Sequence, residues 1–334
     1  MRRVAFSIVT GLLFVLFCYP GQLFAAPYYE GKVLTIIVGY SPGGGYDRVA
    51  RLLAKYLSNH IPGNPKVVVQ NMPGADSMIG ANYLYNIAKP DGFTIGTFNR
   101  GLVFADLLKA EGARFDLAKF SWVGSAAVES SVLVFHTALN FKTIEDVAKA
   151  KSQINIGCTG PADAINIIPI FLKEYLGYHF KFVTYPASPE VMLAIERREV
   201  DGRGASYSSV KPFIERGLVA PVLRGRVIEA GIEKLPADEE LARDQKVKTL
   251  MTMRSVPDGI GRPYVAPPGT PEKAMSVLRD AFAEAIKDPA LQQDARKTQL
   301  SLEYVPAGEV QKVLKYLANQ PPEIIKEFGK YVKF

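Results

Sequence analysis

The sequence is poor in the residues on which metal sites and small secreted proteins depend. Among its 334 residues are two cysteines, three histidines and one tryptophan. A chain that loses its N-terminal stretch with Cys18 keeps only Cys158, which excludes an internal disulfide and leaves stability to the size of the core. The histidines, His60, His136 and His179, form no close-spaced pair of the kind found in zinc motifs. We therefore expect no metal and no cofactor.

Long apolar runs are also lacking, except at the N-terminus. There Arg2 and Arg3 precede an apolar stretch, Val4 to Tyr19, and small residues follow at Ala25 and Ala26. This order is typical of a secretory signal peptide. The stretch is shorter than the ~20 residues that span a bilayer, which argues against a membrane anchor. Residues 1–26 are predicted to be removed and the mature protein to be exported.

Charge of one sign is not concentrated anywhere in the chain. The formal net charge of +7 falls to +5 without Arg2 and Arg3, and the remaining excess is diffuse. A surface for nucleic acid is therefore not expected. The fractions of hydrophobic (48%) and charged (22%) residues are those of a globular protein. Its length corresponds to about two domains at roughly 150 residues each.

Apolar strand-like runs alternate along the chain with segments of helical periodicity. This alternation predicts an α/β fold with mostly parallel sheets. The last quarter, which begins at the helix start Thr270-Pro271-Glu272, is predicted to be helical without strands of its own and to cover the first sheet. Residues 225–262 are expected to form loops and short helices. The predicted strands are 33–40, 66–70, 94–97, 121–125, 131–135, 154–158 and 180–184, and the helices are 49–57, 78–87, 144–150, 164–175, 190–197, 274–285, 290–298 and 308–317.

A glycine-rich segment, Gly39 to Asp47 with the sequence GYSPGGGYD, lies between a predicted strand and a predicted helix. Consecutive glycines allow the backbone to approach a ligand closely, and the N–H groups at a helix start attract anions. The segment lacks the Gly-Lys-Ser/Thr of a P-loop and the spacing of a dinucleotide fingerprint. It is read as an anion-binding loop, with a tight turn that needs glycine for steric reasons as the alternative.

The same segment matches G-x-S-x-G, the pattern of a hydrolase nucleophile, at Ser41. The residue after the nucleophile must donate its backbone N–H to the oxyanion, and Pro42 has none. No histidine follows His179 to act as the base. A hydrolase is therefore the weakest interpretation, and the chain is predicted not to be an enzyme.

Three further loops follow predicted strands, as the glycine-rich loop does. They are NMPGADSMIG at 71–80, FNRG at 98–101 and CTGPAD at 158–163. Ligands of open parallel sheets bind outside the carboxyl ends of the strands. We expect these loops to meet in a cleft between two lobes.

These segments resemble the periplasmic solute-binding receptors of tripartite tricarboxylate transporters. The resemblance rests, in order, on IIVGYSPGGGYDRVARLLAKYL, VVVQNMPGADSMIGANYLYNIAKPDGFTIG, INIGCTGP, REVDGR and YVAPPGTPEKAMSVLRDAF. It implies a two-lobed periplasmic binding protein of type II, or Venus flytrap, with lobe I at 27–125 plus 256–334 and lobe II at 126–255. It also implies delivery of a small organic acid to a permease made of a large and a small membrane subunit. A periplasmic sensor that signals to a membrane receptor would carry the same sequence features.

Carried over from this family, the ligand contacts fall on loops of both lobes. The resemblance assigns ligand contacts to Tyr40, Ser41, Gly43, Gly44, Gly45, Asp47, Gly74 and Ala75 in the first lobe, and to Thr159, Gly160, Tyr185 and Ser206 in the second.

The chain departs from the usual family pattern at several of these loops, with Asp76 in place of a glycine, Pro161-Ala162-Asp163 in place of a glycine and serine run, and Pro186 after Tyr185. Two acids near the cleft favour a mono- or dicarboxylate over a tricarboxylate. Arg100 lies just past a strand end, where a guanidinium can grip a carboxylate with two hydrogen bonds. We predict that it contacts the ligand, with a solvated surface arginine as the alternative.

Overall fold

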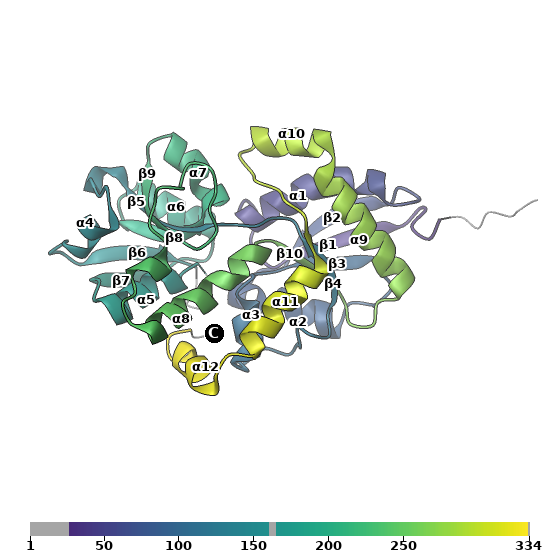
Figure 1. Cartoon of the computed structure of the whole chain (residues 1–334). Coiled ribbons are helices and arrows are strands. Elements are labelled where there is room, and N and C mark those ends of the chain that lie inside the picture. Colours follow the sequence, from purple (N-terminus) through teal and green to yellow (C-terminus); the bar gives the residue numbers. More distant parts are fainter. Residues whose placement is uncertain (1–26, 160–164, 333–334) are drawn as a thin grey trace, which may run out of the picture.

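The computed structural model describes residues 27–159 and 165–332, which form two lobes, each built on one β-sheet with helices around it (Figure 1). The predicted two-lobed α/β architecture is confirmed. The expected signal peptide, 1–26, lies outside the described residues. Within the described part of the chain, no helix is both long enough and apolar enough to cross a membrane.

The first sheet has six strands in the order β11-β4-β10-β3-β1-β2. Its strands are β1 (Val33–Val38), β2 (Lys66–Asn71), β3 (Thr94–Thr97), β4 (Ser121–Ser125), β10 (Pro263–Ala266) and β11 (Val305–Pro306). β1 pairs in parallel with β2 and β3, whereas β10 is antiparallel to β3 and β4, and β11 is antiparallel to β4. β4 leads out to the second lobe and β10 returns from it, so the two run in opposite directions.

The second sheet has five strands in the order β7-β6-β8-β5-β9. Its strands are β5 (Ser131–His136), β6 (Ile154–Cys158), β7 (Phe180–Thr184), β8 (Gly202–Ser206) and β9 (Val219–Arg224). β6 is parallel to β7 and β8, and β5 is antiparallel to β8 and β9. Both sheets are thus mixed, which corrects the expectation of mostly parallel sheets.

Helices surround both sheets and bridge them. The helices of the first lobe are α1 (Gly45–Leu57), α2 (Met78–Asn86), α3 (Leu102–Leu107), α9 (Glu272–Lys287), α10 (Pro289–Lys297) and α11 (Ala307–Ala318). Those of the second lobe are α4 (Ile144–Ala148), α5 (Ile167–Leu176), α6 (Ser188–Glu196) and α7 (Tyr207–Glu215), and the bridging helices are α8 (Gln245–Ser255) and α12 (Pro322–Gly329). Short 3₁₀ helices lie at Ser58–His60, Ala75–Ser77, Thr137–Leu139, Asp238–Leu241 and Val256–Ile260.

The spacing of apolar residues explains the longer helices and strands. In α1, Val49, Leu53 and Leu57 recur every fourth residue and are buried in the core with β1. The expectation of no strand in the last quarter is wrong, because β11 joins the first sheet, and β10, just before that quarter, was not predicted. These strands have four and two residues, too few to show a period. Within 225–262, the polar helix α8 is longer than the short helices expected there.

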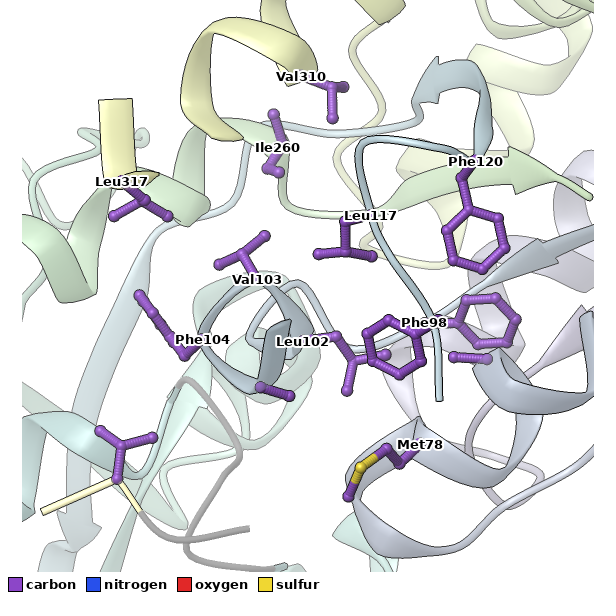
Figure 2. Packing of buried hydrophobic residues seen from close by; sticks show 14 of the residues in the cluster. Met78, Phe98, Leu102, Val103, Phe104, Leu117, Phe120, Ile260, Val310 and Leu317 are labelled. Carbon is purple, nitrogen blue, oxygen red and sulfur yellow. The ribbon is translucent and has the colours of Figure 1, made fainter. Parts of the chain in front are cut away.

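An apolar core joins the two lobes. The ring of Phe328 in α12 lies 4.6 Å from that of Phe104 in α3 and 5.6 Å from that of Phe171 in α5. Figure 2 shows the first-lobe side of this cluster, where Val103 and Leu117 gather near Ile260. The chain crosses between the sheets through a first crossing segment, residues 126–130, and a second, residues 256–262. The lobes are therefore connected by packing as well as by backbone.

Candidate functional site

A cavity lies between the lobes at the ends of strands from both sheets. The space between its lining residues that holds no protein atom is about 780 Å³, part of it open to solvent. Its first-lobe lining comes from the loops after β1 and β2 and the start of α1. Its second-lobe lining comes from the loops after β6 and β7, from β8 and from the start of α7, and Arg262 of the second crossing segment completes it. The described lining residues are Gly39, Tyr40, Ser41, Gly44, Gly45, Tyr46, Pro73, Gly74, Ala75, Asp76, Ser77, Thr159, Ile165, Pro186, Ala187, Ser188, Pro189, Arg203, Ala205, Ser206, Ser209 and Arg262.

Most of the residues assigned to ligand contacts from the sequence meet in this cavity. Those that line it are Tyr40, Ser41, Gly44, Gly45, Gly74, Ala75, Thr159 and Ser206. Gly43, Asp47, Arg100 and Tyr185 are not among its described lining residues, and Gly160 lies outside the described residues. The loops after β1, β2 and β6 therefore converge as expected, although not every side chain in them faces the cavity.

Asp47 shapes the glycine-rich loop from within. Its carboxylate accepts a hydrogen bond of 2.9 Å from the Gly43 N–H, and Arg51 and Asn71 donate to the same carboxylate. Burial opposes ionisation of Asp47, but the hydrogen bonds from Arg51, Gly43 and Asn71 lower its pKa. Asn71 also donates to the Tyr40 carbonyl at 2.8 Å. The buried carboxylate thus holds the loop in shape.

Four helices begin at this cavity. The N-cap residues of α1, α2, α6 and α7 are Gly44, Ser77, Ala187 and Ser206, and all four line it. Within the described structure, none of these four residues accepts a side-chain cap hydrogen bond from its helix. Away from the cavity, α4, α8 and α10 are capped by side chains, whereas α3, α9, α11 and α12 are not. What distinguishes the cavity is that four helix N-termini meet there. Uncapped N–H groups and helix dipoles from both lobes therefore favour an anion here.

The loop that precedes α2 has an unusual backbone. Ala75, Asp76 and Ser77 have φ angles of 45°, 50° and 81°, a left-handed conformation that costs side-chain-bearing residues roughly 1–2 kcal/mol each. Ser77 connects this loop to two neighbouring loops, because its buried hydroxyl donates to the Gly39 carbonyl and accepts from the Asn99 N–H, both at 3.1 Å. Strain of this kind is concentrated at binding sites.

Two buried arginines, Arg203 and Arg262, line the cavity. Neither was predicted to contact the ligand, although Arg203 ends the segment REVDGR. Arg203 in β8 donates to the Ser188 carbonyl and hydroxyl at the start of α6. Arg262, at the end of the second crossing segment, pairs with Glu129 at 2.9 Å. Arg203 stands in a strand in which every residue is buried. The sequence signal for Arg203 is a charged residue within a short segment of otherwise small residues, GRGAS.

Arg100 has a different place from the one predicted. Its side chain is 1% exposed, its Nε donates to Asp258 at 2.9 Å, and its two Nη atoms donate to the hydroxyls of Ser206 and Ser131. An acid of the protein itself thus occupies the position predicted for a ligand carboxylate. Among the described lining residues, Ser206 is the one to which Arg100 donates a hydrogen bond.

Tyr185 also departs from its predicted role. Its ring packs beside the second-lobe core that includes Val191, and burial together with the charge of Glu199 raises the pKa of its hydroxyl. The neighbouring residues Pro186 and Ala187 line the cavity instead.

Comparison with known proteins gives a consistent picture. Residues 49–330 match the family model described as tripartite tricarboxylate transporter family receptor. The structure of the periplasmic binding protein BugD superposes with a TM-score of 0.76 at 20% identity, covering 91% of this chain and 99% of that one. The structure of Rpa4515 from R. palustris with adipate gives 0.71 at 19% identity, covering 89% and 97%. That of MatC from Rhodopseudomonas palustris with bound malate gives 0.67 at 18% identity, covering 90% and 99%.

Proposed function

Because the chain belongs to the tripartite tricarboxylate transporter receptor family, we propose that it is a periplasmic solute-binding protein for a small organic acid. The acid, a mono- or dicarboxylate, binds in the cavity between the lobes. The observation that carries this proposal is the convergence of four helix N-termini, without side-chain caps in the described structure, on that cavity. Backbone N–H groups at helix starts can bind a carboxylate by hydrogen bonds, with no charged side chain required.

The two lobes supply two sets of donors. Gly44 and Gly45 at the start of α1, with Gly74 and Ala75 before α2, receive one end of the acid. Thr159 and the starts of α6 and α7 receive the other end. Two relatives of the same fold bind malate and adipate, which each carry two carboxylates, and this supports a ligand with an acid group at one or both ends.

Delivery completes the proposed function. The signal peptide, residues 1–26, directs the chain to the periplasm, the lobes close over the acid, and the closed form docks on a permease with a large and a small membrane subunit. The receptor itself performs no chemistry. Its family and the identity of the lining residues both support a binding role without catalysis.

Ligand-induced stabilisation tests the proposal. Purified protein lacking residues 1–26 is unfolded and refolded to remove any bound acid, then heated with malate, adipate, succinate, benzoate, acetate and citrate separately. A bound acid at 100 times its dissociation constant adds about 2.7 kcal/mol, which raises the unfolding midpoint. Matched amides of the same acids serve as controls and leave the midpoint unchanged. Absence of a shift with every acid would contradict carboxylate binding.

A further inference from the structure

We propose that Arg262 couples occupation of the cavity to closure of the lobes. Its side chain, which belongs to the second crossing segment, is 2% exposed, lines the cavity and contacts the first crossing segment and one helix of each lobe. The inference rests on the proposed function, because it takes the ligand to be an anion held between the lobes.

Arg262 first ties the two crossing segments together. Its Nε donates to Glu129 at 2.9 Å, and Glu129 lies in the other segment. The backbones of the segments are bonded as well, from the Ala126 N–H to the Arg262 carbonyl and from the Glu129 N–H to the Asp258 carbonyl, both at 2.9 Å. The guanidinium is thereby fixed at the pivot about which the lobes move relative to each other.

From this pivot the guanidinium reaches one helix of each lobe. It lies 4.5 Å from the ring centre of Tyr46 in α1, a cation–π contact. Its Nη2 lies 3.4 Å and 3.3 Å from the hydroxyls of Ser208 and Ser209 in α7. Ser208 also donates to Glu129 at 2.8 Å, which extends the pair into the second lobe.

Gly45 makes this close approach of the lobes possible. A Cβ atom at Gly45 would lie 2.6 Å from Arg262 Nη2 and would also collide with the hydroxyl of Ser209. The first residue of α1 therefore touches the start of α7 and the guanidinium together. A rotation that moved α7 away from α1 would break this contact.

The energetic consequence follows from burial. A buried guanidinium loses free energy of stabilisation when any of its partners is removed. Opening the lobes would separate it from either Tyr46 or the α7 hydroxyls. A carboxylate at the start of α1 also contacts the start of α7, with its charge enclosed beside Arg262, only when the two lobes lie together. Since a ligand shifts an equilibrium only by its different affinity for the two states, this charge favours closure.

Distances between spin labels on the two lobes test the proposal. Labels are attached to the cysteines of Lys89→Cys in the first lobe and Lys181→Cys in the second, both exposed positions, with the native thiol removed by Cys158→Ser. Pulsed electron resonance then measures the distance distribution without ligand and with adipate or malate. The variants are Arg262→Gln, Arg262→Lys and the double variant Arg262→Gln with Glu129→Gln, which leaves no unpaired buried charge. Arg279→Gln is the control, because Arg279 pairs with Glu272 inside one lobe.

We expect the double variant without ligand to lose about tenfold in the ratio of closed to open molecules, Arg262→Lys to recover part of the closed population, and Arg279→Gln to match the wild type. A wild-type distance distribution in the double variant overturns the proposal, even if affinity for adipate is lost. If neither acid binds the wild type, the proposed carboxylate function fails for these probes, while the ligand-free distributions still decide the role of Arg262.

Discussion

The guanidinium of Arg100 and the carboxylate of Asp258 form an ion pair of 2.9 Å in which the two side chains are 1% and 0% exposed. Arg100 follows β3 in the first lobe, and Asp258 lies in the second crossing segment. Asp258 also pairs with Arg254, which in turn pairs with Asp238. This chain of buried charges fixes the second crossing segment against the first lobe. A buried pair of this kind adds little net stability, but breaking it leaves a charge without its partner.

Replacement of Arg100 by glutamine is therefore expected to lower stability rather than ligand affinity. Loss of one partner of a buried pair costs about 3–5 kcal/mol, measured as the free energy of unfolding in urea. The double variant Arg100→Gln with Asp258→Asn removes both charges and should recover part of this loss. Normal stability combined with lost affinity for adipate or malate would instead put Arg100 in contact with the ligand.

Two adjacent glycines of the first loop are expected to respond differently to alanine. Gly44 has a φ of −76°, and a Cβ there would meet its nearest atom only at 3.9 Å, so Gly44→Ala should unfold within about 0.5 kcal/mol of wild type. Because Gly44 lines the cavity and is proposed to receive the carboxylate, calorimetry with the best acid should show at least tenfold weaker binding. Gly45→Ala should lose stability by about 1–3 kcal/mol, because its Cβ collides with Ser209 and Arg262. Unchanged affinity in Gly44→Ala would mean that the loop is only a turn.

Glu229 makes stability depend on pH. Burial, aided by the negative charge of Glu129, raises the pKa of Glu229 from 4.5 to about 7, against the opposing effects of the Ser130 N–H, Arg262 and Lys211. The folded protein therefore holds this proton where the unfolded chain has released it, and stability falls as pH rises from about 4.5 to about 7. The shift corresponds to about 3 kcal/mol.

Urea unfolding at pH 5 and pH 8 measures this dependence. In Glu229→Gln, the free energy of unfolding is expected to differ less between the two pH values than it does in the wild type. Glu233→Gln, which removes an acid from the same segment, is the control with which Glu229→Gln is compared. An equal pH dependence in Glu229→Gln and wild type would contradict the assignment to Glu229.

Phe328 is expected to contribute strongly to the apolar packing between the lobes. It is fully buried between Phe104 of α3 and Phe171 of α5, so Phe328→Ala should cost about 3–5 kcal/mol in urea unfolding. Tyr316→Ala, at a position that is 38% exposed on α11, should cost far less. A loss below about 1 kcal/mol in Phe328→Ala would mean that α12 contributes little to the packing of the lobes.

Much of the fold follows from patterns within short stretches of sequence. The apolar strand at Val33–Val38, the helical spacing of Val49, Leu53 and Leu57, and the glycine-rich turn between them are local properties of the chain. When glycines separate a strand from the helix that follows, the N-terminus of that helix lies at the end of the strand, whatever the rest of the chain packs against it. For this reason the loops around Tyr40, Gly74 and Thr159 could be assigned to the cavity from sequence.

The pairing of the buried arginines was decided by tertiary structure alone. Arg262 and Glu129 lie 133 residues apart in sequence, and Arg100 and Asp258 lie 158 apart. Nothing local distinguishes an arginine whose carboxylate partner lies in a distant segment from one that faces a ligand, because the burial of a charge depends on which segments pack around it. Strands β10 and β11 became strands for the same reason: they are too short to have a pattern, and the hydrogen bonds that define them are supplied by β3 and β4.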